Sequence, residues 1–188
     1  MWRLAIALVI VLGLLIGAGR WLAAHREASQ RTADQTPVTT PENSDYYLKD
    51  ATIYQLTPEG RLAYRAHSVE ALHFPDDSAR LSDIDVRYVK GTPTYWHLHA
   101  NKGHVPADQP HSLYLYDGVT GRHPRDNGAM VRLETTHAWV YPDRNLIESD
   151  AHVKAFEPGQ TVTGDGMRVN LETNKLNLLN NVHVTYAP

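Results

Sequence analysis

The side chains most suited to metal binding in this 188-residue sequence are its eleven histidines, since it contains no cysteine. His97 and His99 lie two positions apart, and His104 follows shortly after them. On a β-strand, residues two apart face the same side, so both imidazoles would point outward together. A metal site needs about three or four converging ligands, and no carboxylate has an obvious spacing to join these histidines. We therefore expect solvated surface histidines and no metal site.

Acid–base catalysis would require paired carboxylates in a cleft. Asp83 and Asp85 share one face of an expected strand, but that face is the polar one, where a carboxyl pKa has little reason to move. The sequence has no Gly-x-Ser-x-Gly elbow, phosphate-binding loop or HExxH motif, and it has no thiol nucleophile. These features predict a protein that is not an enzyme and that needs no cofactor.

The charge balance excludes another class of partner. There are 18 basic and 21 acidic residues, with a formal net charge of -3. Nucleic-acid binding proteins present a strongly basic field, which this composition does not supply. Ten tyrosines against two phenylalanines are more typical of amphipathic strands than of a thick, dry core.

The elements that carry these residues repeat. A strand–turn–strand unit occurs over residues 100–119, 136–153 and 164–184, at intervals of roughly thirty residues. One strand pair cannot hide its apolar face from water, so such units are expected to join into a continuous sheet. The predicted strands are 51–56, 61–66, 83–89, 95–100, 113–116, 130–135, 138–141, 146–149, 151–156, 167–171 and 176–186.

Alternation defines two faces along these strands. Trp96, Leu98 and Ala100 face one way, whereas His97 and His99 face the other. No stretch after residue 45 sustains a helical period, so the domain is predicted to be all-β. Two structures satisfy the pattern: a closed sandwich, or an open folded sheet whose groove accepts an apolar ligand.

The N-terminus predicts a membrane segment. Leu4 to Gly19 carries no charge, and a helix reaching Ala24 would span ~30 Å, which is enough for a bilayer. We expect an anchor helix over 1–25, a polar tether over 26–45 and a β domain over 46–188 outside the cytoplasm. A cleaved signal peptide, with a site near Gly17–Gly19, is the alternative. Gly13 and Gly17 form a GxxxG step that would let another helix approach closely.

Several short motifs occur in one order along the chain. They are Thr57-Pro58-Glu59-Gly60 with Leu62-x-Tyr64-Arg65, then Pro93-Thr94-x-Trp96-x-Leu98-x-Ala100, then Leu113-Tyr114-Leu115-Tyr116, and finally Gly166-Met167-Arg168. With the single N-terminal helix, this ordered set resembles the LptC family of lipopolysaccharide export proteins over the whole chain.

The resemblance implies an open, elongated antiparallel β-jellyroll of OstA-like repeats in the periplasm, behind one helix in the inner membrane. The protein would receive lipopolysaccharide from the LptBFG transporter and pass it to LptA. Its N-terminal edge would meet LptF, and its C-terminal edge, with Val182, Val184 and Tyr186, would meet LptA. Gly13 and Gly17 would pack among the helices of LptF and LptG, and ATP hydrolysis would belong to the transporter.

Acyl chains would lie among inward residues assigned by alternation: Tyr64, Ile84, Val86, Trp96, Leu98, Leu115, Leu133, Val140 and Val169. Two alternatives stay open. One is a soluble periplasmic bridge that resembles LptA. The other is a β-repeat carbohydrate-active enzyme or adhesin, which would have buried carboxylates and a polar groove.

Overall fold

The computed structural model describes residues 43–57, 59–89 and 95–186, and every structural statement below concerns these ranges. The expected anchor helix, most of the tether, and with them Gly13 and Gly17, lie outside the described residues. Within these ranges, no helix has the length and apolar character needed to cross a bilayer.

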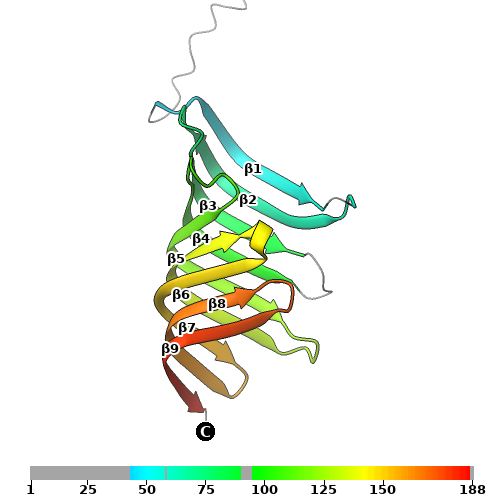
Figure 1. Cartoon of the computed structure of the whole chain (residues 1–188), viewed down its shortest axis with the longest axis vertical. Helices are drawn as coiled ribbons and strands as arrows, with labels where there is room; N and C mark the ends of the chain where they lie inside the picture. Colours follow the sequence, from blue (N-terminus) through cyan, green and yellow to red (C-terminus); the bar gives the residue numbers. More distant parts are fainter. Residues whose placement is uncertain (1–42, 58, 90–94, 187–188) are drawn as a thin grey trace, which may run out of the picture. The chain divides into compact units, whose positions relative to one another are not determined.

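The described residues form one sheet of nine antiparallel strands whose order in space equals their order in sequence (Figure 1). The strands are β1 (Tyr46–Leu56), β2 (Leu62–His73), β3 (Ala79–Tyr88), β4 (Trp96–Val105), β5 (Leu113–Pro124), β6 (Met130–Tyr141), β7 (Leu146–Glu157), β8 (Gln160–Asn170) and β9 (Lys175–Tyr186). A short 3-10 helix, η2 (Pro142–Arg144), connects β6 to β7. The sheet is open, so the prediction of an open, all-β antiparallel sheet is confirmed and a closed sandwich is excluded.

Each strand bends near its middle, where the pairing register of the central and C-terminal strand pairs shifts. Residues with positive φ lie within several of these strands, namely Asp50 in β1, Asp83 in β3, Asp117 in β5, Gly166 in β8 and Asn181 in β9. Aspartate, asparagine and glycine enter this left-handed region at the lowest cost, and bulges bend a strand. A row of such residues therefore folds the whole sheet along one line.

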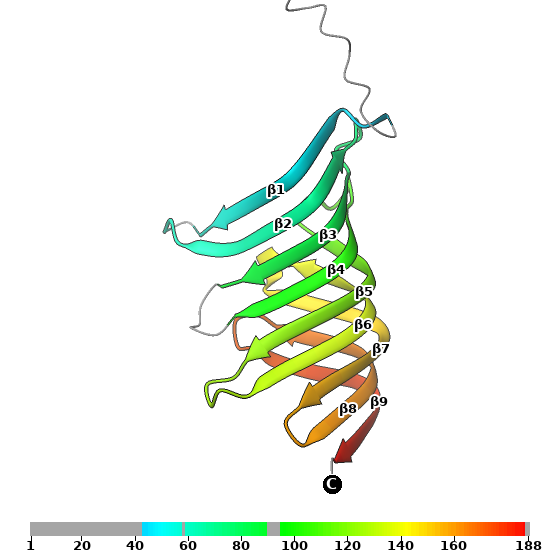
Figure 2. The ribbon, with the colours of Figure 1, turned by 180° about the vertical axis from the view of Figure 1, so that it is seen from behind.

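The fold creates two arms whose inner faces oppose each other, seen as two layers of strands in the front and rear views (Figures 1 and 2). We call arm A the side of the bends that carries Tyr64, Trp96 and Val131. Arm B is the side that carries Leu115, Val140 and Leu176. Apolar side chains from both arms meet in a single buried cluster between them. The alternation predicted from sequence is thus confirmed on the central strands.

The sequence analysis misplaced several strand boundaries. The segments 130–135 and 138–141, predicted as two strands, are one strand, β6, and 146–149 and 151–156 are joined in β7. The segment 113–116 extends to Pro124. In each case the polar or glycine residues at the bend look like a turn in the sequence. A bulged strand tolerates the same residues without ending.

Candidate lipid-binding groove and its edges

The nine residues predicted to line an acyl-chain groove come together in the structure. Eight of them, all except Tyr64, are buried members of the cluster between the arms, and Tyr64 is half-buried and packs against that cluster. Arm A supplies Ile84, Val86, Trp96, Leu98 and Leu133, whereas arm B supplies Leu115, Val140 and Val169. Their common inward direction is established, and their contact with lipid stays a prediction.

The arms are closed against each other near β3. The Tyr88 hydroxyl donates a hydrogen bond to Oδ1 of Asn145, which follows η2 on the opposite arm. Tyr64 stacks on Tyr88 with ring centroids 6.4 Å apart. Burial raises the pKa of the Tyr88 phenol, and the carboxylates of Glu172 and Asp143 raise it further. Both phenols therefore remain protonated and neutral, and the interior is filled here by the chain's own side chains.

Toward β9 the arms separate and leave a cavity of about 530 Å³. That volume falls within the usual range for small-molecule sites. Its apolar wall comes from both arms: Trp96, Val131, Ala155, Val162, Leu176 and Leu178. Charged side chains lie at the rim, where Arg125 is paired with Glu157 and Lys175 lies nearby. The cavity thus has an apolar interior and a polar opening, which suits an amphipathic lipid.

Trp96 places one polar atom on this apolar wall. Its side chain is 1% exposed, and its indole Nε1 makes no hydrogen bond with any described residue. Leaving such a buried donor unpaired costs about 1–3 kcal/mol. The ring borders the cavity, and Nε1 itself is buried.

His123 supports Trp96 from the neighbouring strand and was missed by the sequence analysis. The two rings stack with centroids 4.9 Å apart, and His123 also lies against the cavity. Burial lowers the pKa of His123, and the charge of Arg125 lowers it further, against the hydrogen bond to the Tyr95 carbonyl. The alternation Val119-x-Gly121-x-His123 could have revealed this inward position, but the predicted strand ended at Tyr116.

The predicted partner edge lies on β9, which within the described residues pairs with β8 alone. Val182, Val184 and Tyr186 are 49%, 47% and 72% exposed. The opposite edge, β1, pairs only with β2 and exposes Leu48, Ile53, Tyr54 and Leu56. Exposed apolar side chains beside unpaired backbone groups are typical of an edge that adds a strand from a partner.

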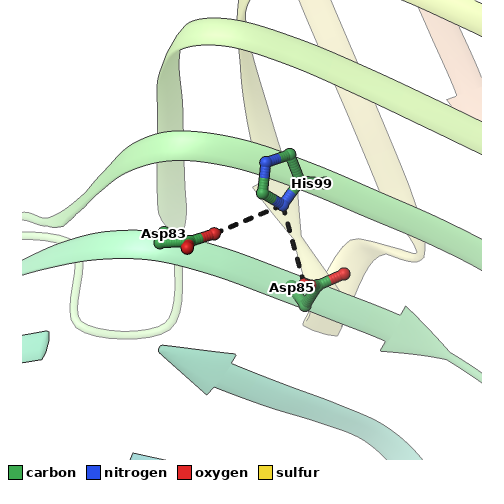
Figure 3. Close-up of side chains that lie close together, drawn as sticks. All are labelled: Asp83, Asp85 and His99. Carbon is green, nitrogen blue, oxygen red and sulfur yellow. Dashed lines mark ion pairs between the residues drawn. The ribbon is translucent and has the colours of Figure 1, made fainter. Parts of the chain in front are cut away.

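The outer face corrects one expectation about the histidines. Asp83 and Asp85 lie beside His99, with carboxylate oxygens 3.7 and 3.6 Å from its Nδ1 (Figure 3). The absence of a carboxylate partner was thus wrongly predicted, because the β3–β4 register sets Asp85 opposite His99. The three possible ligand atoms lie within 4.8 Å of one another, but all three side chains are at least one third exposed and pair with one another.

Asp85 also contradicts the expectation that its pKa would not move. Burial alone would raise the pKa of this carboxyl, but the hydrogen bond and charge of His97, with a smaller contribution from His99, hold it below its usual value. No buried carboxylate pair faces the groove within the described residues.

Comparison with known proteins agrees with this geometry. A family model described as "Lipopolysaccharide-assembly, LptC-related" matches residues 8–187. The fold is similar to a crystal structure of LptH, described as the LptA-homologous periplasmic component of the lipopolysaccharide transport device of Pseudomonas aeruginosa. The TM-score is 0.51 at 12% identity, over 66% of this chain and 95% of that one. No curated protein matches the sequence.

The family match extends over nearly the whole chain and includes every described strand. Proteins of this family serve lipopolysaccharide transport and do not catalyse a reaction, so the prediction that the chain is not an enzyme is confirmed. This chain belongs to the LptC family.

Proposed function

We propose that this protein is an inner-membrane-anchored periplasmic component of lipopolysaccharide export, which receives lipopolysaccharide from LptBFG and passes it to LptA. The observation that carries the proposal is the cavity of about 530 Å³ between the two arms, with its apolar wall and polar rim. The acyl chains occupy this cavity and, when the arms separate further, the groove between Ile84, Leu98, Leu115 and Val140.

The energetics suit a carrier that must also release its cargo. Burying an acyl chain contributes ~0.8 kcal/mol per CH₂ without requiring a specific hydrogen bond. When the arms separate further, the Trp96 N–H adds one directed contact, to an ester or amide carbonyl at the head of an acyl chain. Binding of this kind fixes the depth of the lipid in the groove and leaves the chain free to slide along it.

The two edges join the groove to its neighbours. Pairing of β1 with the β-jellyroll domain of LptF, and of β9 with LptA, would extend one sheet across three proteins and align their apolar faces. Residues 1–25 hold the domain at the inner membrane as a single-pass helix, with the β domain in the periplasm. Gly13 and Gly17 let that helix pack against the helices of LptF and LptG.

A photo-crosslinking scan in cells tests the groove. A photoreactive residue at Val162 or Leu178, which line the cavity, is expected to capture lipopolysaccharide. Thr161 and Thr163, the neighbours of Val162 in sequence on the opposite face, do not line the cavity. They are the matched controls and are expected to capture little. Equal capture at the paired positions, or capture only at the controls, would reject the groove as the lipid site.

The likeness to the LptA homologue favours a second candidate, a soluble bridge released from the membrane. Mass spectrometry of the mature protein separates the two. A retained N-terminus supports the anchored component, whereas an N-terminus between Arg20 and Ala24 supports the bridge.

A further inference from the structure

The outer face of arm A carries a row of four arginines and one histidine directly opposite one another. Arg65 of β2 is paired with Arg87 of β3, Arg87 with His97 of β4, His97 with Arg122 of β5, and Arg122 with Arg132 of β6. Neighbouring strands lie ~4.8 Å apart, so the row crosses five strands in ~19 Å.

Without a bound ligand, repulsion between the arginines of this row destabilises the sheet. Like charges directly opposite on neighbouring strands destabilise the pairing. Within the described residues, none of the four arginines forms an ion pair with a carboxylate. By contrast, Arg168 on the outer face of arm B has its guanidinium 3.5 Å from Glu148. Repulsion left uncompensated at one place on the surface indicates a ligand of opposite charge.

The row borders a hollow of about 350 Å³. Three arginines line it, Arg65, Arg87 and Arg122, against one carboxylate, that of Asp85. Asp85 is already engaged, because it accepts a hydrogen bond from His97 and lies 3.6 Å from Nδ1 of His99. The hollow therefore keeps a positive charge when its histidines are neutral.

Hydrogen bonds between Arg122 and His97, and between His97 and Asp85, fix the orientation of Arg122. Nη2 of Arg122 lies 3.3 Å from Nδ1 of His97, whose Nε2 contacts Asp85. With the proton assigned to Nε2, Arg122 donates to His97 and His97 donates to Asp85, which steadies one wall of the hollow. Thr120 and His99 also line the hollow and add hydrogen-bonding groups that could meet hydroxyls.

We propose that this hollow binds a phosphate ester carried on a sugar. Arginine binds phosphate through paired N–H groups, and only β4 lies between Arg87 on β3 and Arg122 on β5, so both can reach one phosphate from opposite sides. The hydroxyl of Thr120 and the imidazole of His99 at the wall suit sugar hydroxyls, and a hollow accommodates a single sugar phosphate better than the flat surface of a bilayer. The site lies on the opposite face of the sheet from the groove and does not depend on lipid entering it.

Titration of the purified full chain with glucose 6-phosphate tests the proposal. The wild type should bind glucose 6-phosphate at least tenfold more tightly than glucose or inorganic phosphate, and more weakly as salt increases. The double variant Arg87→Gln/Arg122→Gln should lose at least tenfold in affinity. Arg168→Gln, which removes one charge from the outer face of arm B and does not line the hollow, is the control and should change the affinity less than twofold.

Stability gives a second readout that a purely structural role would not produce. Without ligand at low salt, the double variant should have a higher Tm than the wild type, because repulsion is relieved. Unchanged affinity in the double variant, or glucose bound as tightly as its phosphate, would overturn the proposal. Inorganic phosphate bound as tightly as the sugar ester would overturn the sugar assignment. Arginine-dependent binding to phosphatidylglycerol vesicles alone would assign the row to a membrane surface instead.

Discussion

The indole of Trp96 lies against the imidazole of His123, with ring planes 13° apart. His123 is buried, and burial, together with the charge of Arg125, keeps its pKa below the ordinary value near 6.5. The unfolded chain therefore binds a proton at a pH where the folded chain does not, and folding loses stability as pH falls below ~6.5.

We expect His123→Phe, which keeps a ring against Trp96, to reduce this loss. Urea unfolding at several values between pH 8 and pH 5 measures it. The free energy of unfolding of the variant should fall less with decreasing pH than that of the wild type. An identical slope in both proteins would mean that His123 does not resist protonation.

Gly121 lies where a methyl group has no room. A Cβ at this position would lie 2.7 Å from Cγ of the buried Leu133 on the next strand. Gly121→Ala should lower the free energy of unfolding by ~1–3 kcal/mol, as overpacking does elsewhere. Gly103→Ala is the matched control, because its Cβ would meet Leu81 and Leu113 at 3.4 Å, and it should be near neutral. Chemical denaturation of both variants checks the difference.

The Tyr88–Asn145 hydrogen bond connects the two arms. Tyr88→Phe removes the donor and should lower the free energy of unfolding by ~1 kcal/mol. It should also speed hydrogen exchange in β3 and β7, because a link between the arms is lost. Tyr64→Phe is the control, since the Tyr64 hydroxyl forms no hydrogen bond within the described residues. Equal effects of the two substitutions would show that the arms are held by ring packing instead.

Asp165 lies at a bend and accepts hydrogen bonds from Asn181 and His152. The bond from Asn181 lowers the pKa of Asp165 most, followed by that from His152. Its contribution to stability is therefore present above pH ~4 and lost as pH falls further. Asp165→Asn should lower Tm at pH 7, with a difference that shrinks toward pH 2.5. Asp108→Asn, at an exposed position without an ion pair, should show no such trend.

The β9 edge is tested with proline, which cannot donate a backbone hydrogen bond. Along an edge strand, alternate N–H groups face the neighbouring strand and the open side. His183 and Val184 are adjacent, so the backbone N–H of one points toward β8 and that of the other points to the open side. Of the two variants His183→Pro and Val184→Pro, one should therefore remove an N–H from the open side and leave the β8–β9 pairing intact. That variant should keep its Tm within a few degrees and lose at least tenfold in affinity for LptA. Full retention of binding by both folded variants would argue against edge pairing at this position.

Period-two alternation was sufficient to orient the central strands. Val86, Leu98 and Leu133 were predicted to face inward because their neighbours are charged or polar, and all three are buried. Val182 and Val184 alternate with His183 in the same way, yet both are about half exposed, because β9 is an edge strand among the described residues. Alternation orients a side chain relative to its own strand, and it does not reveal whether another arm covers that side chain.

Features that depend on strand register or on strand bending could not be predicted from the sequence. The contact between Asp85 and His99 arises from the offset between β3 and β4, which no single segment encodes. His123 was missed because Asp117 and Gly118 resemble a turn, although they only bend β5. The charged row is likewise invisible in sequence, since its arginines lie on four different strands.

The strands have the same order in the sheet as in the sequence, and this affects how a protein of this fold can evolve. Since no connection crosses the sheet, a duplicated hairpin can be inserted between existing ones without rewiring the rest. The length of the sheet can thus change by inheritance in steps of one hairpin, while the apolar character of its inner face is kept.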